Sequence, residues 1–308
     1  MWMPPLVFIP RRVHRWLLFN MNSRGYLSVL LVLFSVSTSA EIVIKDDVGR
    51  ELVLSKPAQR VISLAPHLTE VVYAVGGGDQ MVATVAWSDF PEEAKVLPVI
   101  GSNNKINYEA LLSYNPDLVL VWHSGNGDGV IQRLVSLGLN VFVNEPRNLN
   151  NIPATLHKIG HLIGREIEAE IVAQQFQASL ESIRQQYENA RTVDVYYQIW
   201  QSPLITFGGD HLVSDVLRLC GADNVFSNVG PLVPRVGVES VLAVDPEVII
   251  VGQYTEVEAA FDGWRQWPQL RAVARDHLYR VDPYLLHRHT PRIVQGARQL
   301  CEAIDKVR

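Results

Sequence analysis

With 308 residues, of which 48% are apolar, the chain is long enough to bury one or two hydrophobic cores. Its formal net charge is −5, and because residues 1–40 hold four arginines and no acidic residue, residues 41–308 carry −9. This acidic balance argues against nucleic acid or an anionic membrane as the main partner.

The first forty residues have the pattern of a signal peptide. Arg24 precedes an apolar run over residues 26–36, and four small residues follow it. A run of about eleven residues is too short to span a bilayer, which takes about 20. We therefore predict a signal peptide over residues 1–40, with residues 1–20 as an over-extended start. No cysteine that could carry a lipid anchor follows, so the mature chain is expected to be soluble in the periplasm.

Two blocks of the mature chain, residues 41–152 and 192–308, alternate short Val/Ile-rich runs with helical patterns. This alternation is typical of α/β lobes. An antiparallel hairpin is expected over residues 41–54. The expected strands are residues 61–64, 81–85, 118–121, 141–143, 195–199, 248–251 and 277–281.

Residues 153–191 predict a helical linker between the two blocks. Gly164 ends a first helical run, and no Pro or Gly follows it within the linker. The second run shows helical spacing of apolar residues, which predicts one continuous buried stripe. That stripe consists of Ile167, Ile171, Phe176, Leu180, Ile183 and Tyr187. The sequence thus predicts two α/β lobes joined by one stiff helix.

An internal repeat relates the two lobes. Residues 107–121 match residues 237–251, and each copy reads as a short helix, an Asn/Asp-Pro turn and an apolar interior strand. Glu109 and Glu239 occupy equivalent positions in the two copies. Either they mark matching points on two similar lobes, or they are solvated first-turn residues that favour the helix dipole.

No motif of a known catalytic type is present. The chain lacks a G-x-S-x-G elbow, a Walker phosphate loop and an H-E-x-x-H helix. His157 and His161 lie four residues apart and could chelate zinc, but no third ligand is obvious, so an exposed helix face is favoured. We therefore expect no catalytic residue and no metal site, and an exported α/β enzyme is kept as the alternative class.

Tryptophans follow predicted strands in both lobes. Trp87 and Trp122 follow strands of the first lobe and Trp200 follows one of the second. Ligands of α/β sheets bind outside the carboxyl ends of the strands, and indole rings suit a bulky, partly apolar ligand. The pattern favours a cleft between the lobes, and the alternative is that each ring plugs the rim of its own lobe.

Cys220 and Cys301 are the only cysteines, and an even pair in an exported chain favours a disulfide over two buried thiols.

Residues 60–304 resemble the helical-backbone class of periplasmic solute-binding proteins that serve metal-chelate ABC importers. Within that class, three features are most similar to the cobalamin-binding members: the aromatic-Ser-Asp-aromatic-Pro stretch at 87–91, the Trp-x-x-Gly-Asn stretch at 122–126, and the cysteine pair. The other stretches that carry the resemblance are residues 60–70, 115–119, 220–226, 291–293 and 300–301.

The resemblance implies two Rossmann-like lobes with parallel sheets, a single long helix between them, and a ligand cleft between the lobes. It also implies a monomer that is not an enzyme, needs no cofactor, binds cobalamin and docks on an ABC importer permease dimer. Heme or a ferric siderophore is the alternative ligand.

Residue roles follow from the resemblance one by one. Trp87 and Trp122 match aromatic residues that lie against the corrin, and Arg288 matches an arginine that reaches the ligand's polar periphery. Glu109 and Glu239 match glutamates that meet arginines of the permease, and the cysteines match a family disulfide. The expected ligand-binding residues are Trp87, Trp122, Trp200, Tyr284, Leu285, Leu286, His287 and Arg288.

Three positions depart from the family pattern. Val233 replaces a tryptophan, Tyr284 replaces an acidic residue, and Asn103 or Asn104 stands where another tryptophan is common. For the heme alternative, Tyr284, His287 or His289 are the candidate iron contacts. The departures affect the choice of ligand and leave the expected fold unchanged.

Overall fold

The computed structural model describes residues 41–308, and the predicted signal peptide lies outside this range. None of the helices in the described part combines the length and the apolar character needed to cross a membrane.

The first lobe is built on a four-stranded parallel sheet with the order β4-β3-β7-β8. The expected hairpin, β1 (Ile42–Lys45) with β2 (Glu51–Leu54), precedes it. The sheet strands are β3 (Val61–Ser63), β4 (Met81–Ala83), β7 (Leu118–Trp122) and β8 (Val141–Asn144). The other elements are α1 (Pro66–Ala74), the 3₁₀ helices η1 (Gly78–Gln80) and η2 (Glu92–Val96), β5 (Gly101–Ser102), β6 (Lys105–Ile106), α2 (Tyr108–Ser113), α3 (His123–Asn126) and α4 (Asp128–Ser136).

The second lobe repeats this topology with the order β12-β9-β13-β14, again parallel throughout. In chain order, both sheets therefore run second, first, third, fourth. The strands are β9 (Val193–Gln198), β12 (Ala222–Asn224), β13 (Val248–Val251) and β14 (Leu278–Arg280), with a hairpin of β10 (Trp200–Gln201) and β11 (Leu204–Ile205). The helices are α7 (Leu212–Leu219), α8 (Val238–Val244), α9 (Val257–Arg265), α10 (Arg271–Ala274), α11 (Pro283–Leu286) and α12 (Ile293–Asp305). The predicted α/β fold class is confirmed.

The sequence repeat corresponds to α2 with β7 in one lobe and α8 with β13 in the other. β7 and β13 are the third strands in their sheets and are paired on both sides, which explains their apolar sequences. In both copies the residue before the proline, Asn115 or Asp245, has a positive φ, of 44° and 41°. Asn and Asp tolerate this left-handed conformation, so the turn that ends each helix has the same chemistry in both lobes.

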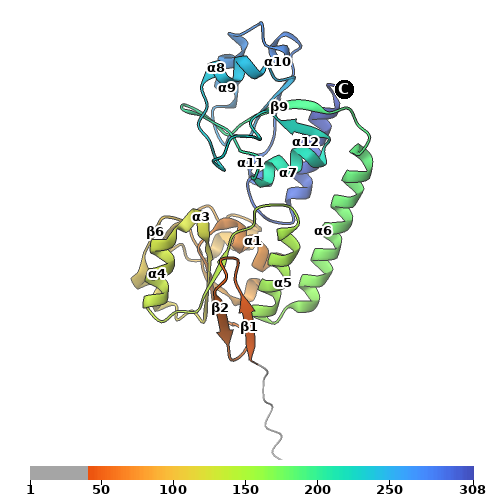
Figure 1. Ribbon diagram of the computed structural model, residues 1–308. Helices are drawn as coiled ribbons and strands as arrows, with labels where there is room; N and C mark the ends of the chain where they lie inside the picture. The colour runs from red at the N-terminus through yellow and green to blue at the C-terminus, as the bar shows by residue number, and fades with distance from the viewer. Residues whose placement is uncertain (1–40) are drawn as a thin grey trace, which may run out of the picture. The chain divides into compact units, whose positions relative to one another are not determined.

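Two helices connect the lobes, α5 (Asn151–Ile163) and α6 (Glu166–Tyr187), and the break between them is at Gly164, where φ is 70°. In Figure 1, α6 runs beside both lobes while α5 lies with the first. The predicted domain boundaries at 152 and 191 stay predictions.

The predicted apolar stripe of α6 is wrong in its first half. Ile167 is 75% exposed and Ile171 is also exposed, whereas Ala169 and Ala173 are buried. The reason is the close approach of α5: a Cβ added at Gly160 would lie 2.5 Å from that of Ala169, so only small residues fit between the helices. The second half, from Phe176 to Tyr187, is buried as predicted.

One hydrophobic cluster extends through both lobes. It includes Leu68 and Phe142 of the first lobe, Phe176 of α6, and Leu217 and Leu300 of the second lobe. Two smaller clusters cover the opposite faces of the two sheets. Because the largest core is shared, the lobes are held together by apolar packing as well as by chain connectivity.

The predicted disulfide between Cys220 and Cys301 is present, and both cysteines are buried. It joins the residue after α7 to α12, across 81 positions of sequence.

Candidate functional site

A cavity of about 300 Å³ lies where the carboxyl ends of the two sheets face each other. Trp122 ends β7, Glu145 follows β8 and Ile199 follows β9, so the cavity occupies the position at which α/β sheets bind ligands. The lining residues come from both lobes and are Trp122, Ser124, Glu145, Pro146, Arg147, Ile199, Phe207, Asp210, His211, Leu212, Leu232, Val233, His287 and His289.

Trp122 is held in place by the Trp-x-x-Gly-Asn stretch. The Asn126 side chain accepts a hydrogen bond from the Trp122 backbone N–H (2.7 Å) and donates one to the Leu64 carbonyl (3.0 Å). A Cβ at Gly125 would lie 2.0 Å from the Trp122 ring, so glycine alone lets the indole fold over this turn. The motif therefore fixes one aromatic wall of the cavity.

Further aromatic side chains are exposed near the carboxyl ends of strands, in the loops after β4 and β13 and in β10, which follows β9. Trp87 is 73% exposed, Tyr254 46% and Trp200 45%. Trp87 also has a φ of 70°, a conformation that bulky residues rarely adopt. Large exposed rings cost hydrophobic free energy in the unbound protein, so such a set indicates a surface that a ligand or partner covers.

Four histidines gather around the cavity. His289 lies between His67 and His211, with ring centroids 5.4 and 6.2 Å away, and its ring centroid is 6.0 Å from that of Trp122. His287 contacts Phe207, which stacks on His211 at 3.6 Å. His67 belongs to the first lobe and the other three to the second, so this histidine cluster joins the two lobes.

The four imidazoles are neutral at neutral pH. Burial lowers the pKa of His287 to about 3 and that of His289 to about 4, and the charge of Arg147 adds to the effect at His289. Burial also holds the pKa of His67 and of His211 well below the ordinary value. The three rings of the cluster that line the cavity, His211, His287 and His289, therefore present no charge to anything that enters it.

Beside the cavity, four charged residues form an interlobe ion cluster: Glu70 and Asp89 of the first lobe, Arg288 and Arg292 of the second. Glu70 accepts hydrogen bonds from Arg288 Nη1 (2.6 Å) and from Arg292 Nε and Nη2 (2.9 and 2.8 Å). Arg288 also pairs with Asp89 at 2.8 Å and donates to the Trp87 carbonyl at 2.9 Å.

The environment of Arg288 follows from these pairs. Its burial would lower its pKa, but the hydrogen bonds to Glu70 and Asp89 outweigh that effect and raise the pKa. The guanidinium is buried in the ion cluster and is absent from the cavity lining, and the expected role of Arg288 at the ligand's periphery stays a prediction.

The structure brings together only part of the predicted ligand set. Trp122 and His287 line the cavity, Trp87 is exposed in the loop after β4, and Trp200 is exposed in β10, which follows β9. Tyr284 packs edge-on against Tyr254 (4.8 Å between ring centroids), with Arg288 5.0 Å from its ring. The next two residues in the chain, Leu285 and Leu286, are buried and do not line the cavity.

Other cavity residues were not predicted. Phe207, His211 and Arg147 come from loops that carry no motif, and His289 was named only for the heme alternative. Tyr254 could have been found, because it follows the second-lobe copy of the repeat strand. Val233, the replacement for a family tryptophan, lines the cavity and is exposed, so this chain has less aromatic surface on that wall.

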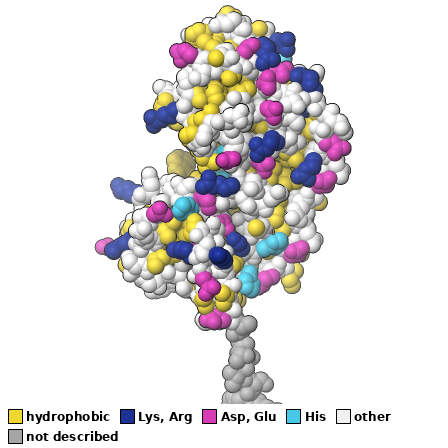
Figure 2. Space-filling view, viewed as in Figure 1, with side chains coloured by type: hydrophobic (Ala, Val, Ile, Leu, Met, Phe, Trp, Pro, Cys, Tyr) yellow, Lys and Arg dark blue, Asp and Glu magenta, His cyan; other side chains and the backbone are white. Residues whose placement is uncertain are grey.

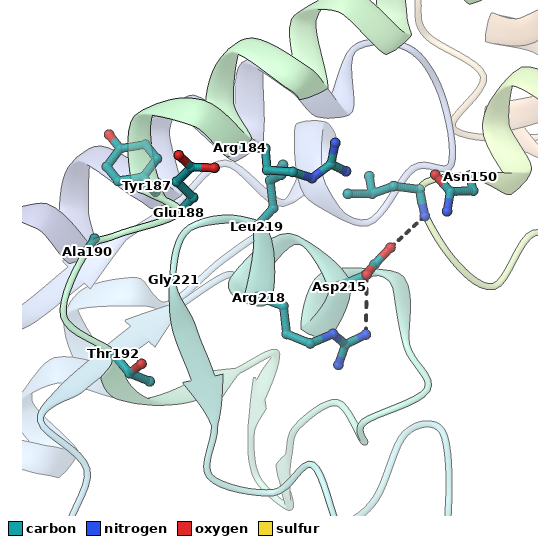
Figure 3. Close-up of a pocket in the computed structure, with 11 residues that line it drawn as sticks. Asn150, Arg184, Tyr187, Glu188, Ala190, Thr192, Asp215, Arg218, Leu219 and Gly221 are labelled. Carbon is teal, nitrogen blue, oxygen red and sulfur yellow. Dashed lines mark hydrogen bonds and ion pairs between the residues drawn. The ribbon is translucent and has the colours of Figure 1, made fainter.

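A second hollow, of about 390 Å³, lies at the other ends of the strands (Figure 3). Thr192 and Gly221, which line it, come just before β9 and β12. Asp215 in its wall already accepts a hydrogen bond from the Leu149 backbone N–H (2.9 Å) and pairs with Arg218 (3.3 Å). The Asp215 carboxylate is thus already paired within the protein, and the hollow lacks the position that α/β ligand sites share.

The charged side chains and the residue types that bind metals do not indicate a further site. Figure 2 shows basic and acidic side chains interspersed over one face of the molecule. Within residues 41–308, no group of three or more His, Cys, Asp or Glu side chains is placed to hold a metal ion. His157 and His161 instead pair with Glu170 and Glu166 of α6, at 3.0 and 3.1 Å, on an exposed surface.

Known proteins are similar to this chain in fold and in sequence. A family model described as periplasmic binding protein matches residues 61–285. A vitamin B12-binding protein of Vibrio cholerae is 32% identical over 246 residues, which cover 80% of this chain and 88% of that protein. The crystal structure of the periplasmic vitamin B12 binding protein BtuF of Vibrio cholerae aligns with a TM-score of 0.75 and 32% identity, covering 82% of this chain and 98% of that one.

The periplasmic heme-binding protein RhuT from Roseiflexus has the same fold, with a TM-score of 0.73 at 21% identity. The aligned region covers 81% of this chain and 99% of RhuT. The fold and the family model agree with the resemblance in the sequence. The chain belongs to the periplasmic binding protein family.

Proposed function

We propose that this protein is exported to the periplasm, captures vitamin B12 (cobalamin) between its lobes and delivers it to an ABC importer without covalent chemistry. The observation that carries the proposal is the cavity at the facing carboxyl ends of the two sheets, together with the exposed side chains of Trp87, Trp200 and Tyr254, which lie shortly after strands of those sheets. The vitamin B12-binding relatives, similar over most of the chain, support the choice of ligand.

The chemistry of the site suits a large, flat, mostly apolar ligand. The cavity alone is at the low end for a small-molecule site, about 300 Å³. A corrinoid is larger than that, so it would also cover Trp87, Trp200 and Tyr254. Covering such rings supplies hydrophobic free energy of about 25 cal/mol per Å², and the neutral histidines impose no charge on the ligand.

Little closure of the lobes is expected on binding. The lobes share one hydrophobic core and are joined by the interlobe ion cluster, so hinge motion would have to break buried contacts. We infer that the ligand enters a preformed groove, in which the rings already occupy their binding positions.

The capture step is tested by titrating the mature chain in parallel with cyanocobalamin, heme and a ferric siderophore, monitored by calorimetry. We expect binding of cyanocobalamin that Trp87→Ala and Trp122→Ala weaken. A matched control is Trp267→Phe, since Trp267 packs against the second-lobe cluster away from the cavity. If the protein binds heme and not cyanocobalamin, the proposed ligand is wrong and heme takes its place. If it turns over a substrate, the protein is an enzyme and the proposed function is wrong.

The delivery step rests on the repeat. Glu109 and Glu239 are exposed in the first turns of α2 and α8, which hold equivalent positions in the two lobes. Two equivalent carboxylates on two similar lobes suit contact with basic groups on the two halves of a permease dimer.

We expect Glu109→Ala with Glu239→Ala to abolish uptake of vitamin B12 while leaving its affinity for the binding protein unchanged. Glu181→Ala, at an exposed glutamate of α6, is the control and should leave uptake intact. Loss of ligand affinity in the double variant would refute the assignment of these residues to docking.

A further inference from the structure

The backbone of Trp87 holds a conformation that residues with large side chains do not favour. Its φ is 70°, and a positive φ is rare for a bulky residue. Such a conformation persists only where the surrounding structure fixes it. A change of φ swings the Cα–Cβ bond relative to the preceding chain, so the exposed indole keeps its place only while this backbone is held.

The residues on either side of Trp87 are anchored in the first lobe. The Ala86 N–H donates to the backbone of β5 (2.8 Å), and the Thr84 hydroxyl donates to the buried Ser88 hydroxyl (2.8 Å). These bonds do not involve the Trp87 carbonyl. That group accepts a hydrogen bond from the second lobe, from Arg288 Nη2 at 2.9 Å.

The Arg288 guanidinium is itself held in place by two carboxylates of the first lobe. Its Nη1 lies 2.6 Å from an oxygen of Glu70 and 2.8 Å from an oxygen of Asp89. Glu70 is buried and also pairs with Arg292. Because the guanidinium is planar and its N–H groups form a rigid fork, fixing Nη1 also fixes the direction in which Nη2 donates.

We propose that Arg288 is a positioning residue for ligand binding: from the second lobe, it holds the Trp87 backbone in the conformation that presents the indole to the ligand. The inference rests on the proposed function, in which the ligand covers Trp87. Both lobes then act on one ring, because Trp87 belongs to the first lobe and the group that restrains it to the second. The ligand meets a segment that binding does not have to order.

The first test needs no ligand and observes the peptide between Trp87 and Ser88. The pair Trp-Ser occurs once in the chain, so ¹³C at the tryptophan carbonyl with ¹⁵N in serine gives a nuclear magnetic resonance signal from this peptide alone. We expect a backbone order parameter of about 0.85 in the wild-type mature chain and a fall toward about 0.6 in Arg288→Gln. Arg265→Gln, at an exposed arginine of α9 that pairs with Asp262, is the matched control and should leave the value unchanged.

The second test separates positioning from direct contact with the ligand. Calorimetry gives the affinity for cyanocobalamin of Arg288→Gln, of Trp87→Ala and of the double variant. If Arg288 acts through Trp87, we expect Arg288→Gln to weaken binding by about tenfold in the wild-type chain and by no more than about twofold in Trp87→Ala. A guanidinium that contacts the ligand directly would give the same loss in both backgrounds.

Three results would overturn the inference. A mobile Trp87–Ser88 peptide in the free wild-type chain shows that this backbone is not held, and this measurement decides even where Arg288→Gln fails to fold. An unchanged order parameter in Arg288→Gln shows that another group holds it. Equal losses of affinity in the two backgrounds assign Arg288 to ligand contact and leave the proposed function standing.

Failure of the proposed function has a different signature. If the wild-type chain does not bind cyanocobalamin, the proposed function is refuted and the role of Arg288 in binding that ligand is refuted with it. The order parameter still shows whether Arg288 restrains Trp87, because that measurement is made on the free protein.

Discussion

Glu70 is the residue whose removal should most weaken the contact between the lobes. Its side chain is 2% exposed and that of Arg288 8%, and three hydrogen bonds of 2.6–2.9 Å join Glu70 to Arg288 and Arg292. Breaking a buried ion pair from one side costs about 3–5 kcal/mol, because the remaining charge stays buried. Arg288 would still pair with Asp89, so we expect Glu70→Gln to lower the free energy of unfolding by about 3 kcal/mol.

The assay is equilibrium unfolding in urea, monitored by tryptophan fluorescence. With an m-value of about 3 kcal/mol/M, the expected loss lowers the urea midpoint by about 1 M. Glu181→Gln is the control, since it removes an exposed ion pair worth about 0–1 kcal/mol. If Glu70→Gln shifts the midpoint no more than this control, the ion cluster does not hold the lobes together and the reasoning is refuted.

Three other perturbations test the fold and the histidine cluster. Replacing Cys220 and Cys301 by serine should lower the free energy of unfolding by about 4–5 kcal/mol, because the disulfide restricts the unfolded chain across 81 positions of sequence. Urea unfolding measures this, and an unchanged midpoint would contradict it. Gly160→Ala should lower the free energy of unfolding by about 1–3 kcal/mol and lower the melting temperature, because the added methyl carbon would lie 2.5 Å from a side-chain carbon of α6. Gly129→Ala in α4, where nothing lies within 4 Å of the added carbon, is the control and should not lower the melting temperature. Because burial lowers the pKa values of these histidines, the unfolded chain binds protons before the folded chain does as the pH falls. The free energy of unfolding should therefore decline between about pH 6.5 and pH 4, by about 1.4 kcal/mol per pH unit for each such histidine. His289→Ala should reduce that slope, and an equal slope in the variant would show that the His289 ring is not buried and neutral.

The local parts of the fold could be predicted from the sequence because their causes are local. Apolar strands, the Asn/Asp-Pro turns at 115 and 245, and the break at Gly164 depend on a few neighbouring residues each. The stripe of α6 was half wrong because periodicity marks which residues are apolar and not which face a second helix approaches. The buried face of α6 depends on its close contact with Gly160, a residue of α5.

The site was less predictable because its parts are distant in sequence. Trp122 could be found, since it ends a recognisable strand and its Gly-Asn turn is adjacent. Arg288 and Glu70, by contrast, are 218 positions apart, and no local pattern shows that they pair. The histidine cluster likewise joins loops from both lobes, so His289 and His211 became candidates for one site only in the folded chain.

The central claim is that the ligand binds between the facing carboxyl ends of the two sheets. Crystals grown with cyanocobalamin would test it most directly, because cobalt gives an anomalous scattering peak that locates the corrin. We predict a single peak in the cavity lined by Trp122 and His289. A cobalt peak in the hollow beside Arg184 and Arg218, or anywhere outside the groove between the lobes, would contradict the account.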